Sequence, residues 1–169
     1  MLKKTRKLIK FFYFKLLRSK ETPHSIALAI AFGVFVGCFV PPGGHTVIVL
    51  LLAFIFKTDK ILAFAATWIA NPYTVPFLYP TFCFIGSKII GAGLSFKEIE
   101  KILLQAIHSF SLTNFEIIGE KLAISFLIGG FIFGVVFGLS SYFITYFLVI
   151  SYRKRRAERM KNKILVDNK

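Results

Sequence analysis

Three long apolar stretches constrain this chain more than any other feature of its sequence. They cover residues 25–56, 61–93 and 122–150, and none of them contains an aspartate or a glutamate. A helix of about 20 apolar residues crosses the hydrocarbon core of a membrane, which is about 30 Å thick. The sequence therefore predicts an all-α integral membrane protein, and its 56% apolar content excludes a disordered chain.

Two of the three stretches are interrupted by helix-breaking residues. The first is broken at Pro41, Pro42, Gly43 and Gly44, and the second is broken at Asn71, Pro72 and Pro76. We expect the first stretch to form a helical hairpin with a Pro/Gly break and the second to form a broken span. The third should be a single Gly-rich span. The arms of the hairpin are short, so the sequence leaves open whether it is re-entrant or a pair of short full spans.

The charge of the chain is concentrated at its two ends. There are 22 lysines and arginines against 8 acids, a formal net charge of +14, and 16 of the basic residues lie in residues 1–22 and 151–169. Basic residues beside membrane spans stay in the cytoplasm. We therefore expect a basic juxtamembrane amphipathic segment (1–22), a membrane domain (23–150) and a basic cytoplasmic tail (151–169). The expected location is a cytoplasmic membrane, with several crossings and both termini inside.

The expected partners follow from this charge pattern. Besides the lipid bilayer itself, the basic termini suit anionic lipid headgroups. Because the tail directly follows a span, membrane topology explains its charge, and we expect no nucleic acid partner.

The two links between the apolar stretches differ in charge. Residues 57–60 carry two lysines and favour the cytoplasm, whereas residues 94–121 carry four acids and three lysines and give no inward signal. Both termini inside require an even number of crossings, which places the second link outside. In that link, two capping boxes predict a short amphipathic surface helix and then a fresh helix start, at Ser95 with Glu98 and at Thr113 with Glu116.

Glycines recur at four-residue spacing in two of the apolar stretches. They are Gly33 and Gly37 in the first and Gly130, Gly134 and Gly138 in the last. Glycines at this spacing share one helix face and let another helix approach closely. We expect these faces to pack helices within the chain, with a homo-oligomer or a membrane protein partner as the alternative.

The two breaks are also the candidate binding site. Gly43 and Gly44 give the first break conformational freedom, and Thr46 is a suitable N-cap for the helix that follows. Asn71 before Pro72 is a suitable cap at the second. Each break supplies a helix N-terminus with a positive dipole end at membrane depth. The candidate substrate-binding residues are Gly43, Gly44, His45, Thr46, Asn71 and Thr74.

Several of these motifs resemble a known family. Residues 22–27 (Thr-Pro-His-Ser-Ile-Ala), Gly33 and Gly37 followed by Pro41, Gly44 with Thr46, and the run Asn71-Pro72-x-Thr74-x-Pro76 followed by Gly86 are similar to the bacterial DUF2062 family. The resemblance covers roughly residues 20–150 and implies a small multi-spanning membrane protein, for which the expected location is the bacterial cytoplasmic (inner) membrane. It implies no established activity. Where the family often has Arg-x-Asn, this chain has Lys57-Thr58-Asp59.

The residues point to no enzyme chemistry. The three histidines are dispersed and the apolar stretches lack carboxylates, so we predict no catalytic residues, no metal and no cofactor. Two functions remain as expectations. One is transport or lipid handling of an anionic or polar solute at the paired breaks. The alternative is a structural or assembly subunit that packs through its Gly faces with another membrane protein.

Overall fold

The computed structural model describes residues 21–40, 44–71, 73–101 and 120–167, and this part of the chain contains helices and no strand. The all-α class is therefore confirmed for these residues. The elements are α2 (Pro23–Phe39), α3 (His45–Ile55), α4 (Lys60–Ala66), the 3-10 helix η1 (Thr67–Ile69), α5 (Val75–Ile89) and α8 (Glu120–Asp167).

The apolar stretches fold into the expected number of helical pieces. Residues 25–56 give the two helices α2 and α3, which contact each other, and residues 61–93 give α4, η1 and α5 with a break at residues 70–74. The last stretch is one unbroken helix, but α8 continues well beyond Ile150 to Asp167. The start of the expected tail is therefore not a structural boundary.

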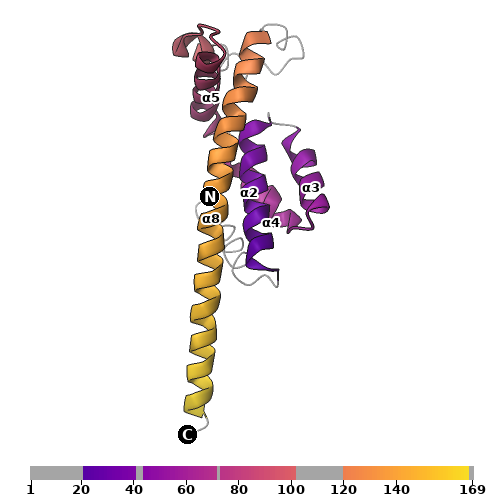
Figure 1. Cartoon of the computed structure of the whole chain (residues 1–169), viewed down its shortest axis with the longest axis vertical. Coiled ribbons are helices and arrows are strands. Elements are labelled where there is room, and N and C mark those ends of the chain that lie inside the picture. Colours follow the sequence, from indigo (N-terminus) through magenta and orange to yellow (C-terminus); the bar gives the residue numbers. More distant parts are fainter. Residues whose placement is uncertain (1–20, 41–43, 72, 102–119, 168–169) are drawn as a thin grey trace.

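Helix α8 is the axis of the molecule, and the other helices are arranged along it (Figure 1). Helix α5 packs along its first part and α2 along its middle, while α3 and α4 lie on the far side of α2. The last part of α8 extends away from the other helices (Figure 1).

Glycines fix where these helices cross. A Cβ at Gly130 would lie 2.8 Å from the carbonyl oxygen of Cys38, and one at Gly138 would lie 3.3 Å from that of Ala31. Later residues of α8 thus meet earlier residues of α2, so the two helices are antiparallel. Gly134, between them, lies against Phe35.

The glycines of α2 face a different neighbour. A Cβ at Gly33 would overlap the carbonyl oxygen of Ala63, and one at Gly37 would lie 2.8 Å from that of Thr67. Helix α4 and η1 therefore run alongside α2 in the same direction. All five glycines singled out in the sequence lie at contacts inside the chain.

The tightest crossing involves two glycines outside that pattern. A Cβ at Gly86 of α5 would overlap the carbonyl oxygen of Ser125, and a Cβ at Gly129 of α8 would overlap that of Phe82. These contacts make α5 antiparallel to α8 and place its C-terminal end beside the beginning of α8.

Two apolar clusters fill the spaces between the helices. One joins α2, α3 and α4 to the later part of α8, and its largest members are Ile26, Val36, Val49, Leu62 and Val149. The other joins the end of α2, α5 and the start of α8, and its largest members are Tyr79, Phe82, Ile99, Leu122 and Phe126.

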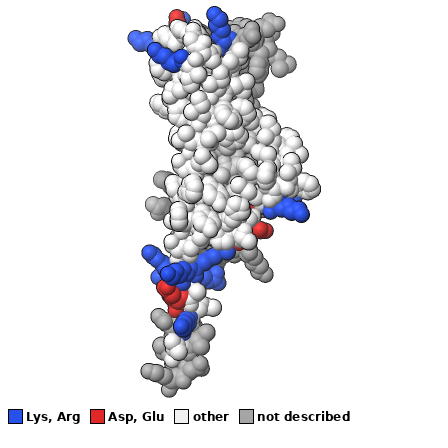
Figure 2. Space-filling model, viewed as in Figure 1, with Lys and Arg blue, Asp and Glu red and all other residues white. Residues whose placement is uncertain are grey.

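The surface of the described part is unusually apolar. In α3 only Val49 and Ala53 are buried, whereas the exposed side chains on this helix are Val47, Ile48, Leu50, Leu51, Phe54 and Ile55. Figure 2 shows a broad uncharged belt with lysines and arginines gathered at its two ends. By length and composition, one described helix segment, Lys121–Lys161, is able to cross a membrane, while α2, α3 and the α4–η1 pair are shorter.

Two of the predicted surface segments lie outside the described residues, in part or entirely. The start of the amphipathic helix after Ser95 is described: residues 96–101 are helical, and the Glu98 carboxylate accepts the Ser95 N–H at 2.9 Å, which is one half of the expected capping box. The Thr113 box and residues 1–20 fall outside.

Candidate functional site

The second break, at residues 70–74, is organised by the side chain of Asn71. Its Oδ1 accepts the backbone N–H groups of Tyr73 at 2.9 Å and of Thr74 at 3.1 Å. Its Nδ2 donates to the carbonyl oxygen of Trp68 at 3.3 Å. Asn71 therefore bonds to backbone groups on both sides of the break.

Thr74 closes the other half of the same break. Its hydroxyl donates to the carbonyl oxygen of Ile69 at 2.6 Å and accepts the N–H of Asn71 at 2.9 Å. The Ile69 carbonyl belongs to the end of η1, where a helix leaves carbonyl groups without helical partners. The structure thus brings the two predicted residues together and ties them to each other's backbone.

The beginning of α5 has its backbone donors occupied. The N–H groups of Thr74 and Val75 both donate to the carbonyl oxygen of Asn71 at 2.9 Å, and Phe77 donates to that of Thr74 at 3.1 Å. Pro76 has no N–H. An anion at this helix end would have to displace bonds that already exist, so the geometry gives Asn71, Thr74 and Pro76 a structural role.

The first break is described from Gly44 onward, and Pro41, Pro42 and Gly43 lie outside the described residues, as does Pro72 of the second break. Gly44 is the N-cap of α3, which begins at His45 without a side-chain capping bond. The predicted N-cap role of Thr46 is therefore wrong, because the helix begins one residue before it. His45 and Thr46 are half-buried and Gly44 is exposed.

The turn between α3 and α4 has a cap that the sequence analysis did not identify. The Asp59 carboxylate accepts the N–H groups of Ile61 at 2.9 Å and Leu62 at 3.0 Å. Aspartate and asparagine are both good N-caps. In this chain Asp59 therefore caps α4.

Contacts distant in sequence hold the beginning of α2 against α8. His24 Nδ1 lies 2.7 Å from the hydroxyl of Tyr142, and Arg153 donates to the carbonyl oxygen of Glu21 at 2.6 Å. Ser25 also donates to the Glu21 carboxylate. The Arg153 contact lies where the basic part of α8 begins, and the Tyr142 contact lies 11 residues earlier in the same helix.

Chemistry-bearing groups are sparse in the described part of the chain. No cluster of three or more metal-ligating side chains occurs there, and two buried side-chain hydroxyls, of Thr58 and Tyr79, make no hydrogen bond.

The fold and the break define a class of protein. It is an all-α protein in which an Asn-Pro-x-Thr-x-Pro motif separates two helical segments and hydrogen-bonds to the backbone between them. The family described as "Uncharacterized protein conserved in bacteria (DUF2062)" matches residues 6–158, and the chain belongs to it. No curated protein and no solved structure matches the chain.

Proposed function

We propose that this chain is a multi-pass protein of the bacterial cytoplasmic membrane that handles lipid. In this arrangement α2 and α3 form a re-entrant hairpin, α4, η1 and α5 cross outward, and α8 crosses back. Both termini and the α3–α4 turn are then cytoplasmic. The observation that carries the membrane placement is the uncharged belt bounded by basic residues at both ends (Figure 2).

The exposed surface of the belt supports this placement. Soluble monomers rarely expose continuous apolar patches of more than a few hundred Å². Here the exposed large apolar residues in the part of α8 before Arg153 are Ile124, Leu127, Phe131, Ile132, Val136, Leu139, Phe143, Ile144, Phe147, Leu148 and Ile150. Lipid tails are the solvent that such a surface requires.

The length of α8 supports a crossing that ends near Arg153. Its 48 residues extend over about 72 Å at 1.5 Å per residue, more than twice the hydrocarbon thickness. Only part of the helix fits in a bilayer, and the basic run at residues 153–156 marks where it would leave.

The contacts of α2 favour the re-entrant hairpin over two full spans. Helix α2 begins beside Arg153 and ends at Gly130, and its 17 residues are about 26 Å long, shorter than the hydrocarbon core of about 30 Å. Helix α3, with 11 residues, is about 17 Å long. The hairpin therefore packs beside the part of α8 that is nearer Arg153, and α5 packs beside the part that is nearer Lys121.

The closed break supports lipid handling over passage of a solute through the interior. Asn71 and Thr74 bond to neighbouring backbone groups, and apolar clusters fill the spaces between the helices. One way in which a bilayer accommodates a segment shorter than itself is local thinning. Lipids beside α3 would therefore have a shorter path between leaflets.

Topology is tested by single cysteines at Lys57, Lys97 and Arg156, probed on intact cells with a membrane-impermeant maleimide. We expect labelling at position 97 alone. Cys38 and Cys83 are fully buried, so the unmodified chain serves as the blank. Labelling of position 57 or 156 from outside would overturn the arrangement.

Lipid handling is tested in proteoliposomes that contain a trace of fluorescent NBD-phospholipid and an aqueous dye. The protein should speed reduction of inner-leaflet NBD by dithionite without releasing the dye. Leu51 and Leu139 are equally exposed, at 56% and 57%, and provide a matched pair. L51N should raise the rate because a polar group on α3 eases headgroup passage, whereas L139N should not. Release of the dye, or no effect on the lipid, would overturn the proposal.

Assembly with another protein is the second candidate, and one observation favours it. Beyond Arg153, α8 extends away from the other helices (Figure 1), with Met160 and Leu165 exposed among basic residues. Because the five predicted glycines lie at contacts inside the chain, assembly would use this segment instead. A cysteine at Met160 that crosslinks to a second copy or to a membrane protein would support it, and a monomer throughout would contradict it.

A further inference from the structure

We propose that the C-terminal end of α5 holds a binding site for the phosphate of an anionic phospholipid in the outer leaflet. A cavity of about 520 Å³ lies there, between the last turn of α5 and the start of the 96–101 helix. This volume is within the range of small-molecule sites, about 300–1,000 Å³. Its lining includes Phe84, Ser87, Lys88, Gly91, Gly93 and Phe96.

The side chains of the cavity combine an apolar wall with one cation. The rings of Phe84 and Phe96 meet edge to face, with centroids 5.8 Å apart. The Lys88 ammonium lies 5.5 Å from the centroid of the Phe84 ring, an arrangement that holds a cation over an aromatic face. Among the described residues that line the cavity, Lys88 carries the charge. The nearby Glu98 carboxylate accepts the N–H of Ser95, which is also part of the lining, at 2.9 Å, so the lining itself offers a ligand positive charge.

The backbone of the turn leaves the cavity open. Helix α5 ends in a Schellman motif, in which the Ala92 N–H donates to the carbonyl oxygen of Ser87 at 2.9 Å and Gly91 has φ +68°. Gly93 also has a positive φ, and a Cβ at either glycine would meet no atom within 4 Å. These glycines shape the turn without filling space, which leaves room beside Lys88.

The ligand must suit both charges at this helix end. Lys88 attracts a phosphate, while the last carbonyl groups of α5 attract hydrogen-bond donors. A phospholipid whose headgroup carries hydroxyls, such as phosphatidylglycerol, offers both groups. Its acyl chains would lie along α5, where Phe77 and Ile89 are exposed.

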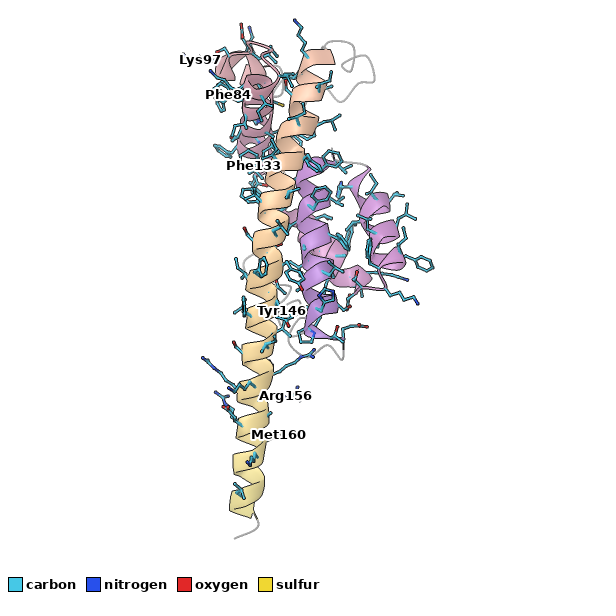
Figure 3. The ribbon with its side chains drawn as sticks, viewed as in Figure 1. Phe84, Lys97, Phe133, Tyr146, Arg156 and Met160 are labelled. Carbon is cyan, nitrogen blue, oxygen red and sulfur yellow. The ribbon has the colours of Figure 1, made fainter. Side chains whose placement is uncertain are left out.

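The position of the cavity matches a lipid headgroup and rests on the proposed membrane placement. Phe84 and Lys97 lie at the end of the molecule opposite the basic run of α8 (Figure 3). Lysines gather at that same end of the uncharged belt (Figure 2). If α8 crosses the bilayer, this end lies at the level of the outer headgroups.

The site is tested by titrating the purified full chain in mild detergent with dioleoylphosphatidylglycerol and counting bound lipid by native mass spectrometry. Lys88 is exposed, so substitution there should not disturb folding. We expect K88E to weaken binding about tenfold, because the charge that attracts the phosphate is replaced by one that repels it. The matched control K97E, at the same end but outside the lining, should bind as the unmodified chain does.

Several outcomes would overturn this inference. Equal binding by K88E and the unmodified chain would remove Lys88 from the site. Equal binding of dioleoylphosphatidylethanolamine would contradict selection of an anionic headgroup, and displacement by millimolar inorganic phosphate would assign the site to free phosphate. The cysteine labelling separates the failure of this site from the failure of the membrane placement. If a cysteine at position 97 is labelled from outside and K88E binds the lipid as the unmodified chain does, the membrane placement stands and only the lipid-binding site is contradicted.

Discussion

The two helix breaks of this chain are closed in different ways. At the second break, Asn71 and Thr74 bond through their side chains to backbone groups on both sides. At the first, the described caps are backbone groups: Val40 N–H bonds to the Val36 carbonyl oxygen, and Gly44 caps α3 without a side-chain bond. An interruption in an apolar region therefore needs its polar groups satisfied, but not by the same means.

The largest effect should come from N71A. This change removes the acceptor for the N–H groups of Tyr73 and Thr74 and the donor to Trp68. We expect the free energy of unfolding in detergent to fall by about 3 kcal/mol, because three backbone groups around the break lose their partners together. Denaturant titration followed by circular dichroism measures the loss.

A serine at the same position is the control for that experiment. N71S keeps a capping oxygen and loses the donor to Trp68, so it should lose only about 1 kcal/mol. If N71A is as stable as the unmodified chain, the break does not depend on its side-chain cap.

The next effect should come from T74V. Valine has nearly the shape of threonine but leaves the Ile69 carbonyl oxygen and the Asn71 N–H without this partner. We expect a loss of about 2 kcal/mol in the same assay, and T74S, which retains the hydroxyl, should recover most of it. A loss for T74S with none for T74V would mean that packing of the methyl group, rather than the hydrogen bonds, stabilises the break.

The α3–α4 turn sharpens the comparison, because it has a side-chain cap at the end of the belt rather than inside it. D59A should lower the free energy of unfolding by about 1 kcal/mol, since Ile61 and Leu62 lose their acceptor. D59N keeps the acceptor and should differ from the unmodified chain by less than about 0.5 kcal/mol. If D59A and N71A lower the free energy of unfolding equally, a side-chain cap inside the belt stabilises the fold no more than a cap at its end.

The sequence predicted those features of the fold that depend on neighbouring residues. Asn71 before a proline predicted the interruption of the second stretch, because a capping side chain and the fixed φ of proline act within one turn. The predicted helix start is wrong, however, since α5 begins at Val75 with Thr74 as its N-cap and not at Pro72 with Asn71. The Ser95 and Glu98 box is local in the same way. The glycine spacing likewise identified a face of α8 that lies against α2.

The features that the sequence did not predict depend on contacts across the fold. Gly86 has no glycine partner at four-residue spacing, and its importance appears only because Ser125 of α8 lies against it. His24 meets Tyr142 across 118 residues. The cap at Asp59 was missed because its link was interpreted as a charge signal alone. The predicted N-cap role of Thr46 was wrong because α3 begins at His45, with Gly44 as its N-cap.

The smallest effect should come from T46V, which is the same change at the first break as T74V is at the second. Thr46 lies inside the first turn of α3 and makes no capping bond. Valine at an interior helix position differs little from threonine, so the loss should stay below about 0.5 kcal/mol. If T46V instead costs as much as T74V, the hydroxyl of Thr46 has a buried partner and the first break is closed by a side chain after all. Both breaks interrupt an apolar stretch in the sequence. A small loss of unfolding free energy for T46V and a large one for T74V would show that side-chain hydrogen bonds stabilise the second break but not the first.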